Sequence, residues 1–179
     1  MRLRGDAIHE LDHNVGRIFD SLKRLGIEEE TLVVYASDNG RGPGRTPEQK
    51  IRGRKLSTYE GGIRVPGLAS WPGTIEPGVL RDPVHVVDWL PTLAALTGQA
   101  WPHPTDGIDL LPALLEGGPL PERDLYWTWR PRTNRWALRR GRWKIVHYGK
   151  EVPDEPSDWA LHDLASDPAD RYPALVDRL

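Results

Sequence analysis

The chain has 179 residues, with 24 Lys and Arg side chains against 26 Asp and Glu, so its formal net charge is −2. This balance argues against a dedicated nucleic-acid binder or a polybasic membrane binder, because both need a large excess of positive charge. The sequence contains no cysteine, which excludes disulfides, Cys-based zinc sites and a Cys nucleophile within these residues. No apolar run approaches the roughly 18 residues of a membrane span, and residues 1–10 lack the apolar stretch of a signal peptide.

The first 36 residues predict a helix followed by a buried strand. Residues 6–25 place their apolar side chains on one arc of a helix, and Gly26 follows as the expected C-terminal cap. Residues 31–36 are apolar and β-prone without polar alternation, which predicts a strand buried on both faces, as in a parallel sheet. This order of elements is typical of an α/β layer.

Prolines and glycines divide the rest of the chain into shorter elements. We expect strand pieces at residues 63–65 and 68–71, a helix that starts at Pro91 and ends at Gly98, and a short helix at 112–115. The last third predicts a small antiparallel sheet with a hairpin turn at Arg140-Gly141; its strands are residues 125–129, 136–139, 142–147 and 159–164. We therefore expect an α/β part over residues 1–120 and a small antiparallel-sheet subdomain over residues 121–179.

One local motif in the first helix matches a zinc site. His9-Glu10-Leu11-Asp12-His13 fits the H-E-x-x-H pattern, in which two histidines bind zinc and the glutamate acts as a base. At about 100° per residue, the apolar arc of this helix centres near Val15 and Leu22, while both histidines lie on the far side. A catalytic pair must face a cleft, so we expect His9 and His13 to be exposed surface residues.

Ser37-Asp38-Asn39-Gly40 follows directly after the expected strand. Open α/β sheets bind their ligands at this carboxyl end. The Asp38 carboxylate and the Asn39 amide carbonyl are adjacent hard oxygen donors, which suit Ca²⁺ or Mg²⁺. The alternative is an Asx-turn that only closes the strand.

The loop that follows is strongly basic. Between residues 41 and 55 a single acid, Glu48, stands against six cations: Arg41, Arg45, Lys50, Arg52, Arg54 and Lys55. Cations beside a divalent-metal site would neutralise the charge that develops on a sulfate or phosphate ester. The alternative is a solvated basic loop.

Two segments around these residues form a longer pattern: Val33-Val34-Tyr35-Ala36-Ser37-Asp38-Asn39-Gly40, and Arg52-Gly53-Arg54-Lys55-Leu56-Ser57-Thr58-Tyr59-Glu60-Gly61-Gly62-Ile63-Arg64-Val65-Pro66. Further blocks follow in order: Trp71-Pro72-Gly73, Asp88-Trp89-Leu90-Pro91-Thr92-Leu93, Asp106-Gly107-Ile108-Asp109-Leu110, Trp143-Lys144 and Leu161-His162-Asp163-Leu164. Over nearly the whole chain this pattern closely resembles the arylsulfatase family of the alkaline-phosphatase superfamily.

The resemblance implies a fold and a set of roles. The fold would be the C-terminal part of an alkaline-phosphatase-like mixed α/β sheet with flanking helices, followed by the small antiparallel sheet. Asp38 and Asn39 would be metal ligands which, with two upstream aspartates, hold a divalent cation, usually Ca²⁺. Lys55 would contact the sulfate oxygens, with Arg41 and Arg54 as further substrate-binding candidates. The block from Glu60 to Arg64 would be mainly architectural.

The resemblance also implies a nucleophile that this sequence lacks. The family hydrolyses sulfate esters with a formylglycine made from Cys or Ser in a C/S-x-P-x-R motif, and no Ser here is followed by x-Pro-x-Arg. The chain therefore looks like the C-terminal third to half of a sulfatase. We expect the 179 residues alone to be inactive, and we expect poor solubility or self-association through an exposed apolar edge and helix face.

Three functions remain open on the sequence. A sulfuric ester hydrolase that acts on a sulfated small molecule or glycan is favoured. A phosphodiesterase or phosphonate monoester hydrolase of the same superfamily would share the metal geometry. A non-catalytic remnant that binds an anionic glycan or a partner is the third. The resemblance suggests an exported protein (periplasmic, lysosomal or extracellular).

The C-terminal strands interleave tryptophans with arginines. The pattern predicts tryptophans on the packed face of a sheet and arginines on its solvent face. His85 is expected to be a half-buried core residue, and Asp88 is expected to cap the helix that begins at Pro91.

Overall fold

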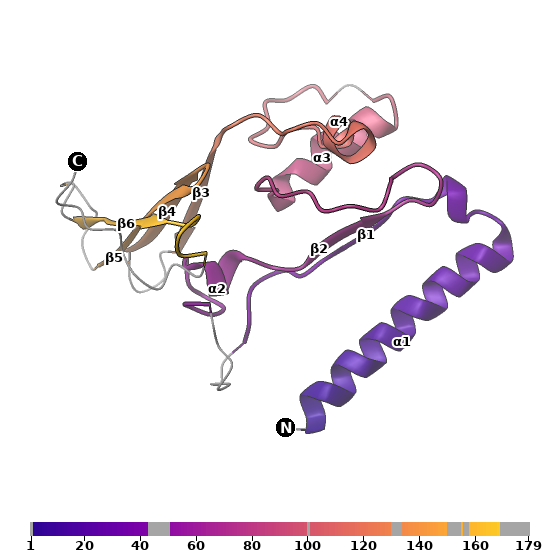
Figure 1. The fold of residues 1–179 in the computed structure, drawn as a ribbon, viewed down its shortest axis with the longest axis horizontal. Coiled ribbons are helices and arrows are strands. Elements are labelled where there is room, and N and C mark those ends of the chain that lie inside the picture. The colour runs from indigo at the N-terminus through magenta and orange to yellow at the C-terminus, as the bar shows by residue number, and fades with distance from the viewer. Residues whose placement is uncertain are drawn as a thin grey trace. The chain divides into compact units, whose positions relative to one another are not determined.

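The structure, a computed structural model, describes residues 2–42, 51–99, 101–129, 134–149, 155 and 158–168. It divides the chain into two compact units. Unit 1 comprises Met1–Tyr35 and Leu68–Val79, and unit 2 comprises Ala36–Gly67 and Leu80–Leu179. Figure 1 shows the elements of both units in chain order.

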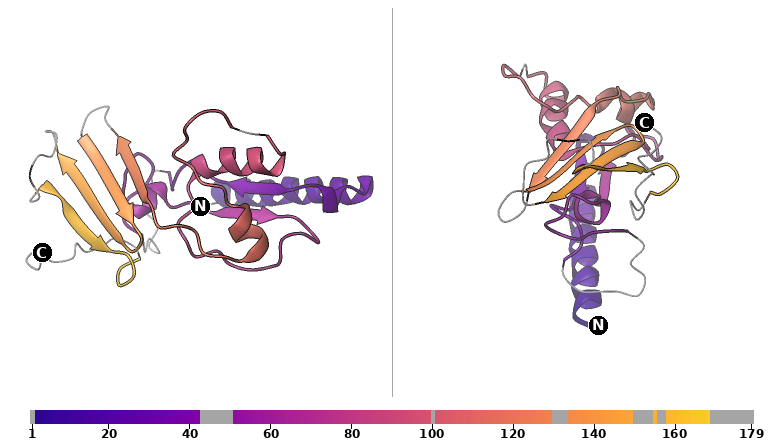
Figure 2. Two further views of the ribbon diagram at one scale, coloured as in Figure 1. Left: turned by 90° about the horizontal axis from the view of Figure 1, so that it is seen from above. Right: turned by 90° about the vertical axis from the view of Figure 1, so that its left-hand side faces the viewer.

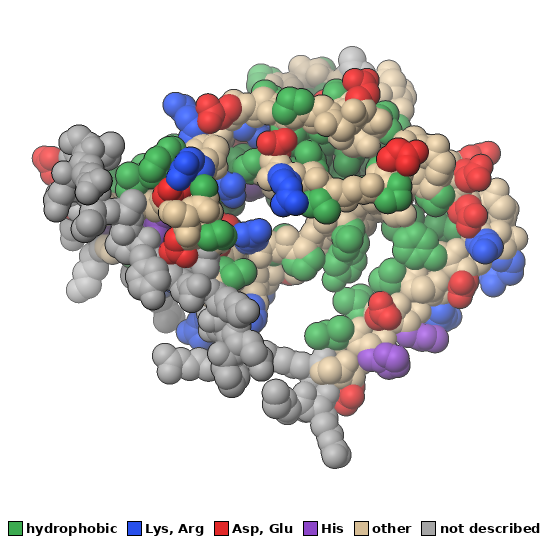
Figure 3. All heavy atoms as spheres, viewed as in Figure 1, with side chains coloured by type: hydrophobic (Ala, Val, Ile, Leu, Met, Phe, Trp, Pro, Cys, Tyr) green, Lys and Arg blue, Asp and Glu red, His purple; other side chains and the backbone are tan. Residues whose placement is uncertain are grey.

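Unit 1 begins with the predicted helix, α1 (Arg2–Leu25). The helix ends where expected, because Gly26 adopts a φ of +68° and its amide donates to the Lys23 carbonyl at 3.0 Å. Hydrophobic and polar side chains occupy opposite sides of α1 (Figure 3). The apolar side is largely in solvent, with Ile8 68% and Ile18 54% exposed. His9 and His13 are exposed, as predicted.

The strand after α1 is less buried than the sequence predicts. A short 3-10 turn, η1 (Glu28–Glu30), leads into β1 (Val33–Ala36), which pairs with β2 (Gly67–Ser70) in a two-stranded sheet. Along β1 the side chains alternate between half-buried and exposed, and Val34 is 37% exposed. The prediction of burial on both faces is therefore wrong, because burial of both faces requires a packed layer on each side of the sheet.

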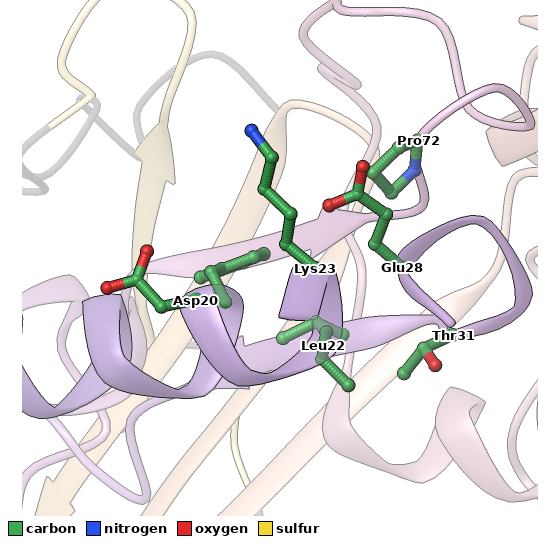
Figure 4. A pocket seen from close by; sticks show the side chains of 8 residues that line it. Asp20, Leu22, Lys23, Glu28, Thr31 and Pro72 are labelled. Carbon is green, nitrogen blue, oxygen red and sulfur yellow. The ribbon is translucent and has the colours of Figure 1, made fainter. Parts of the chain in front are cut away.

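A small cavity of about 110 Å³ lies where α1, η1 and the segment after β2 meet (Figure 4). Its lining includes Phe19, Lys23, Glu28 and Pro72. Nearby, the Trp71 indole donates to the Glu29 carbonyl at 2.6 Å. This bond ties the segment that follows β2 to η1.

Unit 2 ends in the predicted antiparallel sheet (Figure 2). Its strands are β3 (Asp124–Trp129), β4 (Asn134–Arg140), β5 (Trp143–Gly149) and β6 (Ala160–Asp163), which pair in chain order. Arg140 pairs with Trp143, so the hairpin turn is Gly141-Arg142, one residue later than predicted, and Gly141 has a φ of +54°. Only glycine adopts such a φ readily.

Short helices precede this sheet. They are α2 (Glu60–Ile63), the 3-10 turn η2 (Val86–Asp88), α3 (Trp89–Leu96) and α4 (Leu111–Glu116). The helix predicted from Pro91 begins two residues earlier, at Trp89. The strand predicted at 63–65 is wrong, because the Arg64 amide donates to the Glu60 carbonyl at 2.8 Å and closes a helical turn instead.

Asp88 joins three segments of unit 2 through its side chain. Its carboxylate is fully buried and accepts two bonds of 2.5 Å from the Arg123 guanidinium, one of 2.7 Å from the His85 amide and one of 3.1 Å from the Ile108 amide. Its side chain makes no capping bond to α3, so the predicted helix cap is wrong. His85 is half-buried, as predicted.

The same contacts control the charge of Asp88. Burial by itself would raise the pKa of this carboxyl, but the bonds from Arg123, His85 and Ile108 outweigh burial and lower the pKa below its ordinary value. The ionised form therefore favours the folded state. This contribution is fully present above the unfolded pKa of about 3.9 and is lost as the pH falls through the lower folded value.

Asp88→Asn should lower the free energy of unfolding by about 3 kcal/mol at pH 7, because it leaves the Arg123 charge without its partner. The difference from the wild type should shrink below about pH 4, where the wild-type carboxylate loses its advantage. Urea denaturation between pH 3 and 7 measures both effects. Asp124→Asn, at an exposed ion pair with Arg140, is the matched control and should cause a smaller change. A pH-independent difference would contradict the assignment.

Candidate functional site

The Asp38-Asn39 turn leaves β1 as predicted from the sequence. The Ser37 hydroxyl donates to the Asn39 carbonyl at 3.1 Å, and the Asn39 side-chain amide donates to the Gly40 carbonyl at 3.0 Å. The amide nitrogen of Asn39 is thereby engaged, which leaves its side-chain oxygen as an acceptor. The Asp38 side chain is exposed. The turn thus presents two neighbouring oxygen donors of the kind that bind Ca²⁺.

Three glycines allow the loop that carries Lys55 to pack closely against this turn. The Gly40 amide donates to the Gly62 carbonyl at 2.8 Å, and a Cβ at Gly40 would lie 2.1 Å from the Gly61 carbonyl oxygen. A Cβ at Gly61 would lie 2.5 Å from the Arg52 carbonyl oxygen, to which the Gly61 amide donates at 2.6 Å. Any side chain at these positions would force the two backbones apart. Gly40, Gly61 and Gly62, which we call the glycine block, therefore allow one backbone to pack directly on another.

Lys55 joins the same arrangement through its main chain. Its amide donates to the Arg41 carbonyl at 2.7 Å, which places the Lys55 backbone beside the residues that follow Asp38 and Asn39. The side chains of Lys55 and Arg54 are exposed, and Arg41 is half-buried. The structure thus brings the loops of all five predicted site residues together.

The basic loop is not uniformly solvated. The Arg52 guanidinium lies 3.8 Å from the centre of the Tyr59 ring, a cation–π contact that gives this cation a local partner. Arg45, Glu48 and Lys50 lie outside the described residues.

A buried ion pair connects this site to the C-terminal sheet. Lys144 on β5 donates to the carboxylate of Glu60, the first residue of α2, at 2.9 Å. Glu60 is 2% exposed and Lys144 is fully buried. Burial of either charge without the other would be strongly destabilising. The pair therefore holds α2, and with it the glycine block, against the sheet.

The sheet face that packs against α2 and the Lys55 loop agrees with the prediction only in part. By register, Leu125, Ala137 and Val146 share it with the cations Arg135, Arg139 and Lys144. Trp136 and Trp143 lie on the opposite face, and Trp143 is 46% exposed. Trp127 and Trp129 lie on the packed face by register, as predicted, and Arg140 is exposed. The prediction is wrong for Trp136, Trp143 and Arg135, because the loop and α2 supply a carbonyl and a carboxylate to cations on the packed face.

Metal-binding groups are sparse in the described part of the chain. Among those residues, no cluster of three or more His, Cys, Asp or Glu side chains could hold a metal ion. Asp38 and Asn39 are thus two donors of the several that a Ca²⁺ site needs.

No described helix is long and apolar enough to cross a membrane.

Solved structures define the class of fold. A protein described in the metabolism of multiple glycosaminoglycans by Bacteroides thetaiotaomicron superimposes with a TM-score of 0.77 and 28% identity, over 95% of this chain and 40% of its own. A phosphonate monoester hydrolase from Silicibacter pomeroyi superimposes with a TM-score of 0.63 and 23% identity, over 89% of this chain and 35% of its own, a likeness of fold alone. The predicted α/β fold of alkaline-phosphatase-like hydrolases is confirmed.

Family models cover nearly the whole chain. The model "Sulfatase" matches residues 1–99, and "N-sulphoglucosamine sulphohydrolase, C-terminal" matches residues 54–177. Arylsulfatase A from Homo sapiens is 40% identical over 183 residues, which cover 97% of this chain and 36% of that protein. The chain belongs to the sulfatase family, as its motifs predict. It spans well under half the length of the curated relatives that it matches.

We predict that the Glu60–Lys144 pair behaves as one unit in stability measurements. Lys144→Met removes the ammonium group that donates to the buried Glu60 carboxylate and should lower the free energy of unfolding by about 3–5 kcal/mol. Glu60→Leu/Lys144→Met removes both charges and should recover most of this loss. Arg140→Met, at an exposed pair on the same sheet, is the control and should have little effect. Losses that simply add in the double variant would refute the coupling.

Proposed function

We propose that this chain supplies part of the divalent-metal and sulfate-binding site of a sulfuric ester hydrolase. One observation carries the proposal: the Lys55 amide donates to the Arg41 carbonyl, which brings the predicted sulfate-binding lysine to the turn that bears Asp38 and Asn39. Membership of the sulfatase family supports the assignment of roles.

The donor set fits a hard divalent cation, Ca²⁺ first. An aspartate carboxylate and an asparagine amide oxygen are the ligand types that calcium prefers. When bound, such an ion would polarise an oxygen of the sulfate ester. Two donors do not complete a calcium site, so the proposal includes further ligands from outside the described residues. The formylglycine nucleophile would also come from elsewhere, because this chain has no cysteine and no Ser-x-Pro-x-Arg segment.

Lys55 would act on the sulfate group. An ammonium group beside the sulfuryl oxygens binds the ground state and stabilises negative charge that develops as the ester bond breaks. Arg54 and Arg41 would add positive charge to the same pocket. A sulfated small molecule or glycan is the proposed substrate class, supported by the name arylsulfatase A and by the glycosaminoglycan context of the structural neighbour. Export from the cytoplasm is proposed on the family resemblance.

Binding and turnover measurements test these roles. The 179-residue chain alone should give no turnover of an aryl sulfate or an aryl phosphate. In calorimetry, Asp38→Ala should weaken Ca²⁺ binding at least tenfold, and Lys55→Ala should weaken binding of inorganic sulfate about 10–100-fold while Ca²⁺ binding is kept. Arg140→Ala is the control for a general loss of positive charge. Sulfate binding that is unchanged in Lys55→Ala would contradict the site, and phosphate ester turnover would favour a phosphoesterase.

We also propose that the apolar side of α1 mediates self-association of the chain. Leu25, Ile8 and Ile18 are 66%, 68% and 54% exposed. Exposed apolar surface of this extent tends to associate with other apolar surface. Sedimentation velocity should show concentration-dependent oligomers. Ile18→Glu should shift them towards monomer, whereas His13→Glu, another exposed position of α1, should not. A monodisperse wild-type monomer with cooperative melting would contradict this proposal.

A further inference from the structure

The residue after Lys55 has an unusual backbone. Leu56 has a φ of +73° and is the one non-glycine residue with positive φ in the described chain. The left-handed conformation is disfavoured for a residue with a Cβ. The Leu56 side chain is 49% exposed, so burial of its own apolar surface does not explain why it is held there. Something else must hold this conformation.

Arg135 contacts the main chain of Leu56. Its Nη1 donates to the Leu56 carbonyl oxygen, 79 residues away in the sequence. Arg135 lies on β4, opposite Tyr148 of β5, and its guanidinium lies 5.3 Å from the centre of the Tyr148 ring. A planar guanidinium beside an aromatic ring is restrained in position. The sheet therefore restrains the donor of this hydrogen bond.

Tyr148 holds the other end of the same short loop. Its hydroxyl accepts a hydrogen bond of 2.8 Å from the Thr58 amide, and its ring stacks on the Tyr59 ring with centroids 4.6 Å apart. Residues 56–59 are thus bound to β4 and β5 by a carbonyl contact, an amide contact and a ring stack. Lys55 directly precedes this restrained segment, and its own amide donates a hydrogen bond to the Arg41 carbonyl.

We propose that Arg135 is a positioning residue for Lys55. Its hydrogen bond to the Leu56 carbonyl keeps Leu56 in the left-handed conformation, and this conformation orients the neighbouring Lys55. The inference deepens the proposed function, since it concerns the same sulfate contact. Arg135 itself does not touch the anion. It acts on the direction in which the main chain presents Lys55, whose exposed side chain is otherwise free to sample many rotamers.

A rescue experiment on the full chain separates this role from others. Arg135→Ala should accelerate hydrogen exchange of the Lys55 amide about tenfold, the order set by the penalty on a left-handed residue with a Cβ. Arg135→Ala/Leu56→Gly should restore most of the protection, because glycine adopts this φ without a penalty. Arg140→Ala, on the same strand, should leave the Lys55 amide unchanged. Equal acceleration of the β5 amides, or no restoration by Leu56→Gly, would overturn the proposal.

Inorganic sulfate supplies the second readout. Its binding should weaken about tenfold in Arg135→Ala and recover in the double variant. A loss that Leu56→Gly does not reverse would mean that Arg135 contacts the anion directly, which overturns a positioning role. If wild type and Lys55→Ala bind sulfate equally, the proposed function fails, and the exchange experiment still decides whether Arg135 positions the Lys55 backbone.

Discussion

The buried ion pair between Glu60 and Lys144 is the contact on which the candidate site depends. It joins a helical turn near the middle of the sequence to a strand 84 residues later. Either charge alone would be strongly unfavourable in that position, so α2 and β5 have to meet in one register. Once they do, the loop of residues 52–59 is confined between the glycine block and the sheet. The pair thus contributes geometry to the site more than net stability.

A second constraint acts at the scale of single atoms. Gly40, Gly61 and Gly62 allow two stretches of main chain to approach where no Cβ would fit. Their hydrogen bonds hold the Asp38-Asn39 turn to the Lys55 loop without help from side chains. Side chains that carry chemistry are therefore left to point outward, and Asp38 and Lys55 are both exposed. The proposed sulfate site would rely on this separation of structural from chemical groups.

Asp88 and Arg123 play the corresponding role away from the site. Their buried pair holds the start of α3, the segment around Ile108 and the residue before β3 together. Gly107 allows this close approach, since a Cβ there would lie 2.1 Å from the Val87 carbonyl oxygen. The same arrangement therefore occurs twice in unit 2, at Asp88 and at Glu60. In each case a buried carboxylate pairs with a cation from a distant segment, and a nearby glycine allows the neighbouring backbone to approach closely.

Local information in the sequence was enough to identify α1, the C-terminal antiparallel strands, the Asp38-Asn39 turn and the family, because periodicity, caps and ordered motifs are properties of neighbouring residues. It does not reveal which cations are buried, because nothing near Arg135 or Lys144 in the sequence marks them as packed. The alternation of Trp and Arg predicts the packed face correctly for Trp127 and Trp129, but not for Trp136, Trp143 or Arg135. The partners of these cations, the Leu56 carbonyl and the Glu60 carboxylate, come from segments 79 and 84 residues away. The predicted helix cap at Asp88 is wrong for the same reason, since the main partner of this side chain is 35 residues distant. Only the tertiary structure decides such pairings, because the cost of burying a charge depends on which distant group arrives beside it.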